Sequence, residues 1–88
     1  MTKSPDPTTV LELKGILERE RFIPSTYSLA GGRHQDAYCL SPEGGKWSVY
    51  YSERGEEYDK VSFGSEREAC EYFLQRMRSD PGTQRRSY

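Results

Sequence analysis

Apolar residues recur at the spacing of an amphipathic helix in two segments, one near each end of the chain. Thr9 and Glu12 form a capping box before the first segment, since a threonine hydroxyl can cap the amide three residues later. The first helix should end near Phe22, because Pro24 pushes the residue before it out of the helical region. Its predicted buried stripe consists of Val10, Leu13, Ile16 and Leu17.

The second helical segment has the clearer boundaries. Ser65 and Glu68 form another capping box directly after Gly64, which predicts a helix over residues 66–78. Acids stand in its first turn and arginines in its last, which suits the helix dipole at both ends. The predicted buried stripe consists of Ala69, Cys70, Phe73, Leu74 and Met77.

Three segments between these helices alternate in the manner of strands, namely residues 36–41, 46–53 and 58–63. The sequences PEGG and RGEE between them are typical of turns. Connections this short make neighbouring strands antiparallel. The sequence therefore predicts an α+β fold of order α-β-β-β-α, in which two helices pack a three-stranded antiparallel meander.

A chain of 88 residues has room for one small domain. We expect a flexible N-terminus over residues 1–8, a single domain over 9–78 and a flexible basic tail over 79–88. Residues 24–36 are predicted to form a loop that bends at Gly31 and Gly32.

Side-chain alternation assigns the faces of the two later strands. The residues predicted to face the core are Trp47, Val49, Tyr51, Val61 and Phe63. The residues predicted to lie on the opposite, outward face are Lys46, Ser48, Tyr50, Ser52, Tyr58, Lys60 and Ser62.

The face of the first strand is ambiguous, because Ala37 and Cys39 alternate with Tyr38 and Leu40. Small residues fit beneath a helix, which favours an outward position for Tyr38 and Leu40. The alternative, in which the first helix or the N-terminal loop folds over this face and makes it core, remains open at this point.

The net charge of −1 conceals an asymmetry. Residues 36–75 carry nine acids against four basic residues, whereas the segment from Arg76 onward carries four arginines against one acid. An acidic body argues against nucleic-acid binding, where neutralising phosphates dominates the affinity. It suits a basic partner protein, although an ordinary solvated surface explains the same charges.

Neither an apolar leader nor a run long enough to span a membrane is present in the sequence, and we expect a cytoplasmic protein without a membrane partner. Cys39 and Cys70 match no disulfide framework or metal-ligand spacing, so both are expected to be reduced and buried.

Candidate chemistry is sparse. His34 is the only histidine, and a nucleophilic pair with a cysteine would need a placed base and an oxyanion hole. Gly31-Gly32 lacks the spacing of a phosphate-binding loop, and the acids of residues 53–59 lack the spacing of a calcium loop. We therefore expect no enzyme activity, no catalytic residues, no metal and no cofactor.

The most informative feature is the coincidence of tyrosines and acids around residues 50–59. Several aromatic side chains on one sheet face form a patch that usually marks a contact, and tyrosine is frequent at interface hot spots. The predicted partner-binding residues are Tyr38, Tyr50, Glu53, Glu56, Glu57, Tyr58 and Asp59.

The stretches YSLAGGRHQDAYCL, KWSVYYSERGEE and FGSEREACEYFLQRM, within residues 27–77, resemble small immunity proteins encoded beside secreted bacterial polymorphic toxins. The runs YYSERG and EACEYF are the most specific parts of this resemblance. The arginine-rich tail lies outside it.

The resemblance implies a non-enzymatic inhibitor that binds its cognate toxin domain and occludes the active site. The toxin would be an NAD-hydrolysing domain or, as an alternative, a ribonuclease domain. Two other functions stay open: a general protein-interaction or regulatory module, and a nucleic-acid-binding regulator that stacks bases on its aromatic strand face.

Overall fold

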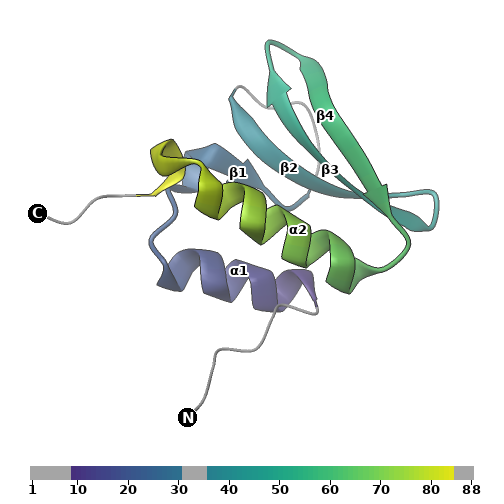
Figure 1. Cartoon of the computed structure of the whole chain (residues 1–88), viewed down its shortest axis with the longest axis horizontal. Coiled ribbons are helices and arrows are strands. Elements are labelled where there is room, and N and C mark those ends of the chain that lie inside the picture. Colours follow the sequence, from purple (N-terminus) through teal and green to yellow (C-terminus); the bar gives the residue numbers. More distant parts are fainter. Residues whose placement is uncertain (1–8, 31–35, 85–88) are drawn as a thin grey trace, which may run out of the picture.

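The structure of the protein is a computed structural model that describes residues 9–30 and 36–84. Its elements are α1 (Val10–Arg19), η1 (Pro24–Thr26), β1 (Tyr27–Ser28), β2 (Ala37–Glu43), β3 (Lys46–Glu53), β4 (Glu56–Phe63), α2 (Glu66–Ser79) and η2 (Pro81–Thr83). Both helices lie on the same side of the sheet, with α2 next to the sheet and α1 beyond it (Figure 1). The predicted α+β fold is confirmed. The positions of Gly31, Gly32 and His34 and the predicted N-terminal segment 1–8 lie outside the described residues.

The sheet differs from the predicted meander in one respect. It has four strands in the order β1-β2-β3-β4, and the additional strand β1 pairs in parallel with β2. The predicted three strands do form antiparallel pairs with one another. A strand of two residues has no periodicity to read, so the segment was predicted as loop.

Two tight turns connect the antiparallel strands. Gly44 and Gly45 both have positive φ, at 56° and 84°, and so do Arg54 and Gly55, at 54° and 79°. Two central residues with positive φ define the hairpin turn whose twist matches that of the flanking strands. Both predicted turns are therefore confirmed, and each fixes the register of its hairpin.

An irregularity in β4 shifts the alternation of its side chains. Val49 pairs with Val61 and Tyr51 pairs with Tyr58, so two residues of β4 lie opposite Tyr50 alone. Asp59, one of these two, has φ of 54°. The extra residue is a β-bulge, and it moves Tyr58 to the side of the sheet that faces the helices.

The capping residues act as the sequence predicted. The amide of Glu12 donates to Thr9 Oγ1 at 3.2 Å, and the amide of Glu68 donates to Ser65 Oγ at 3.1 Å. The first helix ends earlier than expected, at Arg19. The reason is that Arg21 has a left-handed backbone conformation, with φ of 63°, which terminates the helix.

Helices α1 and α2 run side by side in the same direction (Figure 1). Their N-termini are joined by the amide of Val10, which donates to Glu66 Oε2 at 2.8 Å. Their C-terminal ends are joined by an ion pair between Arg78 and Glu20. Parallel helix dipoles repel each other, and these contacts offset that repulsion at both ends.

The hydrophobic core lies between α2 and the sheet and extends to α1. All five residues of the predicted α2 stripe are buried, and so are Leu13, Ile16 and Leu17 of α1. Leu40 is fully buried in this core. The prediction that Ala37 and Cys39 lie beneath a helix while Tyr38 and Leu40 point away is therefore wrong, since β2 pairs Leu40 with the core residue Val49.

The segment after α2 packs against the domain as far as Gln84, whereas the sequence predicted a flexible tail from residue 79. The amide of Ile23 donates to the carbonyl of Thr83 at 2.7 Å, and Phe22 forms an isolated bridge with Gln84. The side chain of Thr83 is only 2% exposed. This segment therefore joins the end of α2 to the residues that follow α1, and the Gln84 side chain donates to the carbonyl of Glu20.

Candidate functional site

Strand pairing places four tyrosines side by side across the sheet. Tyr27 pairs with Tyr38, Tyr38 pairs with Tyr51, and Tyr51 pairs with Tyr58. Paired residues of neighbouring strands project from the same face. We call this line of four residues the tyrosine row, and it lies on the side of the sheet that faces the helices.

The tyrosine row runs from the core to the surface. Tyr27 and Tyr38 pack against the hydrophobic core. Tyr51 is half-buried, and Tyr58 is 43% exposed. The hairpin of β3 and β4 extends past α2 (Figure 1), so its helix-side face is left open near its tip.

The centre of the row is held by polar and ring contacts. The ring centroids of Tyr38 and Tyr51 are 4.9 Å apart in an edge-to-face arrangement. The Tyr38 hydroxyl donates to Asp80 Oδ2 at 2.9 Å. Burial, followed by this hydrogen bond, raises the pKa of Tyr38 above the ordinary tyrosine value.

Arg76 extends the row along α2. Its guanidinium carbon lies 5.5 Å from the ring centroid of Tyr38 and 5.7 Å from that of Tyr72. Its Nη1 donates to the Tyr72 hydroxyl at 3.0 Å. Tyr72 in turn contacts Phe63, with ring centroids 5.2 Å apart. The cation therefore lies between two aromatic rings and fixes their positions.

The acids of the β3-β4 hairpin divide between the two faces. Glu53 and Glu56 pair with each other and project from the face of the tyrosine row. Glu56 raises the pKa of Tyr58, and burial followed by Asp36, Glu53 and Asp80 raises the pKa of Tyr51. The exposed end of the row is thus surrounded by negative charge.

Glu57 and Asp59 do not join this face, although the sequence grouped all four acids. Glu57 pairs with Ser52, on the side of the sheet away from the helices, and Asp59 is at the bulge. We call the side away from the helices the outer face. The four acids therefore do not form the single group that the sequence predicted, because the bulge and the alternation of β4 separate them.

A pocket of about 290 Å³ opens beside the middle of the row. It brings together residues from η1, the start of β2, β3 and η2. The lining residues are Thr26, Asp36, Tyr38, Tyr51, Asp80, Gly82 and Thr83.

Tyr50 is not exposed, and the prediction that it forms part of an outward docking patch is wrong in this respect. It projects from the outer face, as its alternation with Tyr51 predicted, but it is only 2% exposed. Its strand partner is Cys39, which is fully buried. Burial raises the pKa of Tyr50 to about 12.

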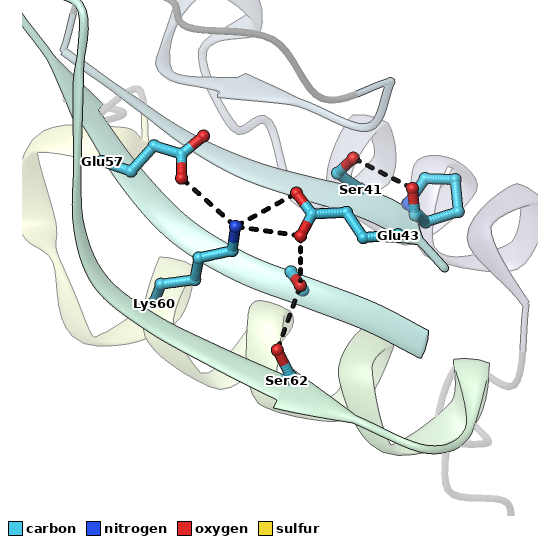
Figure 2. Close-up of polar contacts among 7 residues, drawn as sticks. Ser41, Glu43, Glu57, Lys60 and Ser62 are labelled. Atoms are coloured by element: carbon cyan, nitrogen blue, oxygen red, sulfur yellow. Dashed lines mark hydrogen bonds and ion pairs between the residues drawn. The ribbon is translucent and has the colours of Figure 1, made fainter. Parts of the chain in front are cut away.

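The ammonium group of Lys60 covers the Tyr50 ring at 5.7 Å from the centroid. Figure 2 shows that Lys60 lies between Glu43 and Glu57, with Nζ to Oε1 distances of 2.9 Å and 3.3 Å. Ser48 links Glu43 to Ser62 through contacts of 3.2 Å each. A network of paired charges therefore occupies the outer face beside Tyr50, and this face offers less open aromatic surface than the tyrosine row.

The described residues offer little for catalysis. Cys39 and Cys70 form no disulfide among the described residues and are both buried, as predicted, and burial raises the pKa of Cys70 to about 12. A thiol that stays protonated is a poor nucleophile. Within residues 9–30 and 36–84, no three His, Cys, Asp or Glu side chains are grouped so as to hold a metal ion. No helix in these ranges has the length and apolar character needed to cross a membrane.

Of the predicted set, Tyr38, Tyr58, Glu53 and Glu56 lie on the face of the tyrosine row, together with residues that the sequence did not indicate. Tyr51 was assigned to the core, yet it is half-buried beside the pocket. Asp80 was assigned to a tail. Its sequence context, SDPG, is typical of a turn and was the available signal that this segment has defined structure.

Comparison with protein-family models, curated proteins and solved structures gives no match for this chain.

Proposed function

We propose that this protein is an immunity protein that binds a cognate secreted bacterial toxin domain in the cytoplasm of the producing cell and occludes its active site. The observation that carries the proposal is the exposed end of the tyrosine row, where Tyr58 and half-buried Tyr51 lie beside Glu53 and Glu56. The motifs YYSERG and EACEYF add the resemblance described above.

This surface has the properties of a protein interface. Tyrosine buries a large apolar ring while keeping a polar tip, which makes it a frequent anchor at interfaces. Carboxylates at its rim accelerate the encounter with a basic partner and reject an acidic one. Toxin domains that bind NAD or RNA present cations to their phosphates, so an acidic inhibitor surface is complementary to either active site.

The same charges weigh against the nucleic-acid alternative. Bases could stack on Tyr51 and Tyr58, but Glu53 and Glu56 on the same face repel phosphates. A general protein-interaction module would use the surface in the same way as an immunity protein. The identity of the partner separates these two functions.

Co-expression tests the proposal directly. The C-terminal domain encoded by the gene immediately upstream is expressed with and without this protein, and survival and co-purification are measured. We expect rescue of growth and a stable complex. NAD content and RNA integrity of the cells distinguish an NAD-hydrolysing toxin from a ribonuclease.

Adjacent residues on opposite faces provide a matched pair of variants. Glu56→Lys reverses a charge beside Tyr58, whereas Glu57→Lys reverses one on the outer face. We expect Glu56→Lys to weaken toxin binding at least about tenfold at low salt and Glu57→Lys to have a smaller effect. Tyr58→Ala removes the exposed ring of the row and should also weaken toxin binding, and Leu11→Ala, at a 79% exposed position on α1, is its control.

Toxicity that persists on co-expression, with no complex recovered, would refute the immunity function for that pair. Rescue that is equally sensitive to Glu56→Lys and Glu57→Lys would instead contradict the assignment of the tyrosine row as the contact surface.

A further inference from the structure

The pocket beside the tyrosine row has walls of two kinds. Tyr38 and Tyr51 form an aromatic corner, with their ring planes inclined by 65°. Asp36 and Asp80 supply carboxylates from two segments that are distant in the sequence. Asp80 is oriented by the Tyr38 hydroxyl at Oδ2 and by the amide of Gly82, which donates to Oδ1 at 3.0 Å.

We propose that this pocket accepts an arginine side chain of the partner protein, with the guanidinium group against Tyr51 and its N–H groups directed at Asp36 and Asp80. The inference rests on the proposed function, because the arginine belongs to the toxin domain. Beyond that function, the inference specifies which chemical group of the toxin domain the protein recognises, namely a guanidinium group.

The composition of the pocket selects a cation. An aromatic face attracts a cation through its quadrupole, and a carboxylate pairs with its charge. The local balance is negative, since Asp36 and Asp80 line the pocket, whereas the cation Arg76 is not among the lining residues and contacts the rings of Tyr38 and Tyr72. An anionic group would be repelled by both carboxylates, and a neutral apolar group would gain no pairing with them.

Arginine fits better than other cations. Its planar guanidinium stacks on an aromatic ring and directs several N–H donors at carboxylates at the same time, whereas the lysine ammonium is a strongly hydrated point charge. The pocket volume of about 290 Å³ is at the lower limit for small-molecule sites, about 300–1,000 Å³. This size suits the head of one side chain rather than a whole metabolite.

A small probe tests the pocket without the toxin. Ethylguanidinium and the neutral, isosteric ethylurea are titrated into the protein while the ring resonances of Tyr38 and Tyr51 are followed by NMR. We expect saturable shifts with ethylguanidinium, with a dissociation constant on the order of 1–10 mM, and none with ethylurea. Equal shifts with both compounds would overturn the proposal, as would tighter binding of tetramethylammonium, which would indicate a quaternary ammonium ligand.

Two aspartates give a matched comparison. Asp36 and Asp59 are both exposed and both have left-handed backbone, with φ of 52° and 54°, which asparagine tolerates. We expect Asp36→Asn to weaken ethylguanidinium binding about fivefold and Asp59→Asn to leave it within twofold. Equal affinity of the Asp36→Asn variant and the wild type would overturn the assignment.

The same variants in the complex separate the two proposals. If the upstream toxin is bound and inhibited, Asp36→Asn should weaken the complex about five- to tenfold, and substitution of one toxin arginine should abolish that difference. A complex insensitive to Asp36→Asn refutes the arginine pocket while the immunity function stands. Failure of wild-type protein to bind the toxin refutes the function, and the ethylguanidinium titration still decides what the pocket binds.

Discussion

The hydroxyl group of Tyr38 donates a hydrogen bond to the carboxylate of Asp80, 42 positions further along the chain, at 2.9 Å. This contact joins the second strand of the sheet to the segment that follows α2. It also orients one wall of the pocket and one member of the tyrosine row. Fold stability and the geometry of the proposed binding surface therefore depend on the same hydrogen bond.

Removal of this hydrogen bond should reduce stability. Tyr38→Phe keeps the ring and its contacts with Tyr51 and Arg76, but it removes the hydroxyl donor of Asp80 and leaves the amide of Gly82 as the donor to the other carboxylate oxygen. We expect the free energy of unfolding to fall by about 1–3 kcal/mol in urea denaturation. Tyr58→Phe, at the exposed end of the row, should change it by less than about 0.5 kcal/mol. Equal effects of the two substitutions would contradict a structural role for the Tyr38 hydroxyl.

The segment from Asp80 to Gln84 should contribute to stability. The Thr83 hydroxyl is within 2.7 Å of the carbonyl oxygens of Met77 and Asp80. Thr83→Val preserves the shape but removes this donor, and we expect a loss of about 1–2 kcal/mol on thermal or urea unfolding. Thr83→Ser keeps the hydroxyl and should lose less. Truncation after Ser79 should cost more than Thr83→Val, and a truncated chain as stable as the full chain would refute the packing role of this segment.

The network on the outer face predicts a pH dependence. The hydrogen bond from Lys60 holds the pKa of Glu43 below its ordinary value of 4.5. Ionised Glu43 therefore stabilises the fold above pH 4.5, and this contribution is lost as the pH falls through the lower pKa of the folded state. We expect the difference in free energy of unfolding between the wild type and Glu43→Gln to become smaller as the pH falls below 4.5.

NMR titration of the Glu43 carboxyl group measures the shift itself. Lys60→Met should move its pKa back toward 4.5. An unchanged pKa in this variant would show that Lys60 is not the cause of the shift.

The burial of Tyr50 predicts a dependence at alkaline pH. Its pKa is raised from 10.0 to about 12, so the folded state keeps a proton that the unfolded state has released. Stability should be unaffected by this group below pH 10 and should fall as the pH rises toward 12. Tyr50→Phe should remove the decrease in the free energy of unfolding that Tyr50 causes between pH 10 and pH 12, which is on the order of 2 kcal/mol. Ultraviolet absorbance titration should show one fewer tyrosine that ionises only near pH 12 in the variant than in the wild type.

The sequence predicted those parts of the fold that depend on local patterns. The N-caps Thr9 and Ser65, the stripe of α2 and both turns follow from side-chain chemistry over a few neighbouring residues, and each is confirmed. Strand β1 was missed because its pairing with β2 depends on contacts across the chain. The face of β2 was assigned wrongly because the fit of small residues beneath a helix was the only local criterion.

The candidate site was predicted in part for the same reason. Alternation correctly put Tyr50 and Tyr51 on opposite faces, but it gives no information on what covers each face. Tyr50 is buried on the face away from α1 and α2, whereas Tyr51 on the helix side remains partly open. Tyr58 was assigned to the wrong face because a bulge at Asp59 leaves no sequence signal in a strand of otherwise regular alternation.

The bulge at Asp59 has a further consequence, which concerns self-association. Strand β4 is at the edge of the sheet, and a long, regular edge strand is a template on which other chains can add and aggregate. A bulge with a charged residue interrupts that template, and Lys60 and Glu57 place further charge along it. Deletion of Asp59 would restore a regular edge, and the resulting protein should form oligomers or precipitate at concentrations where the wild type remains dispersed.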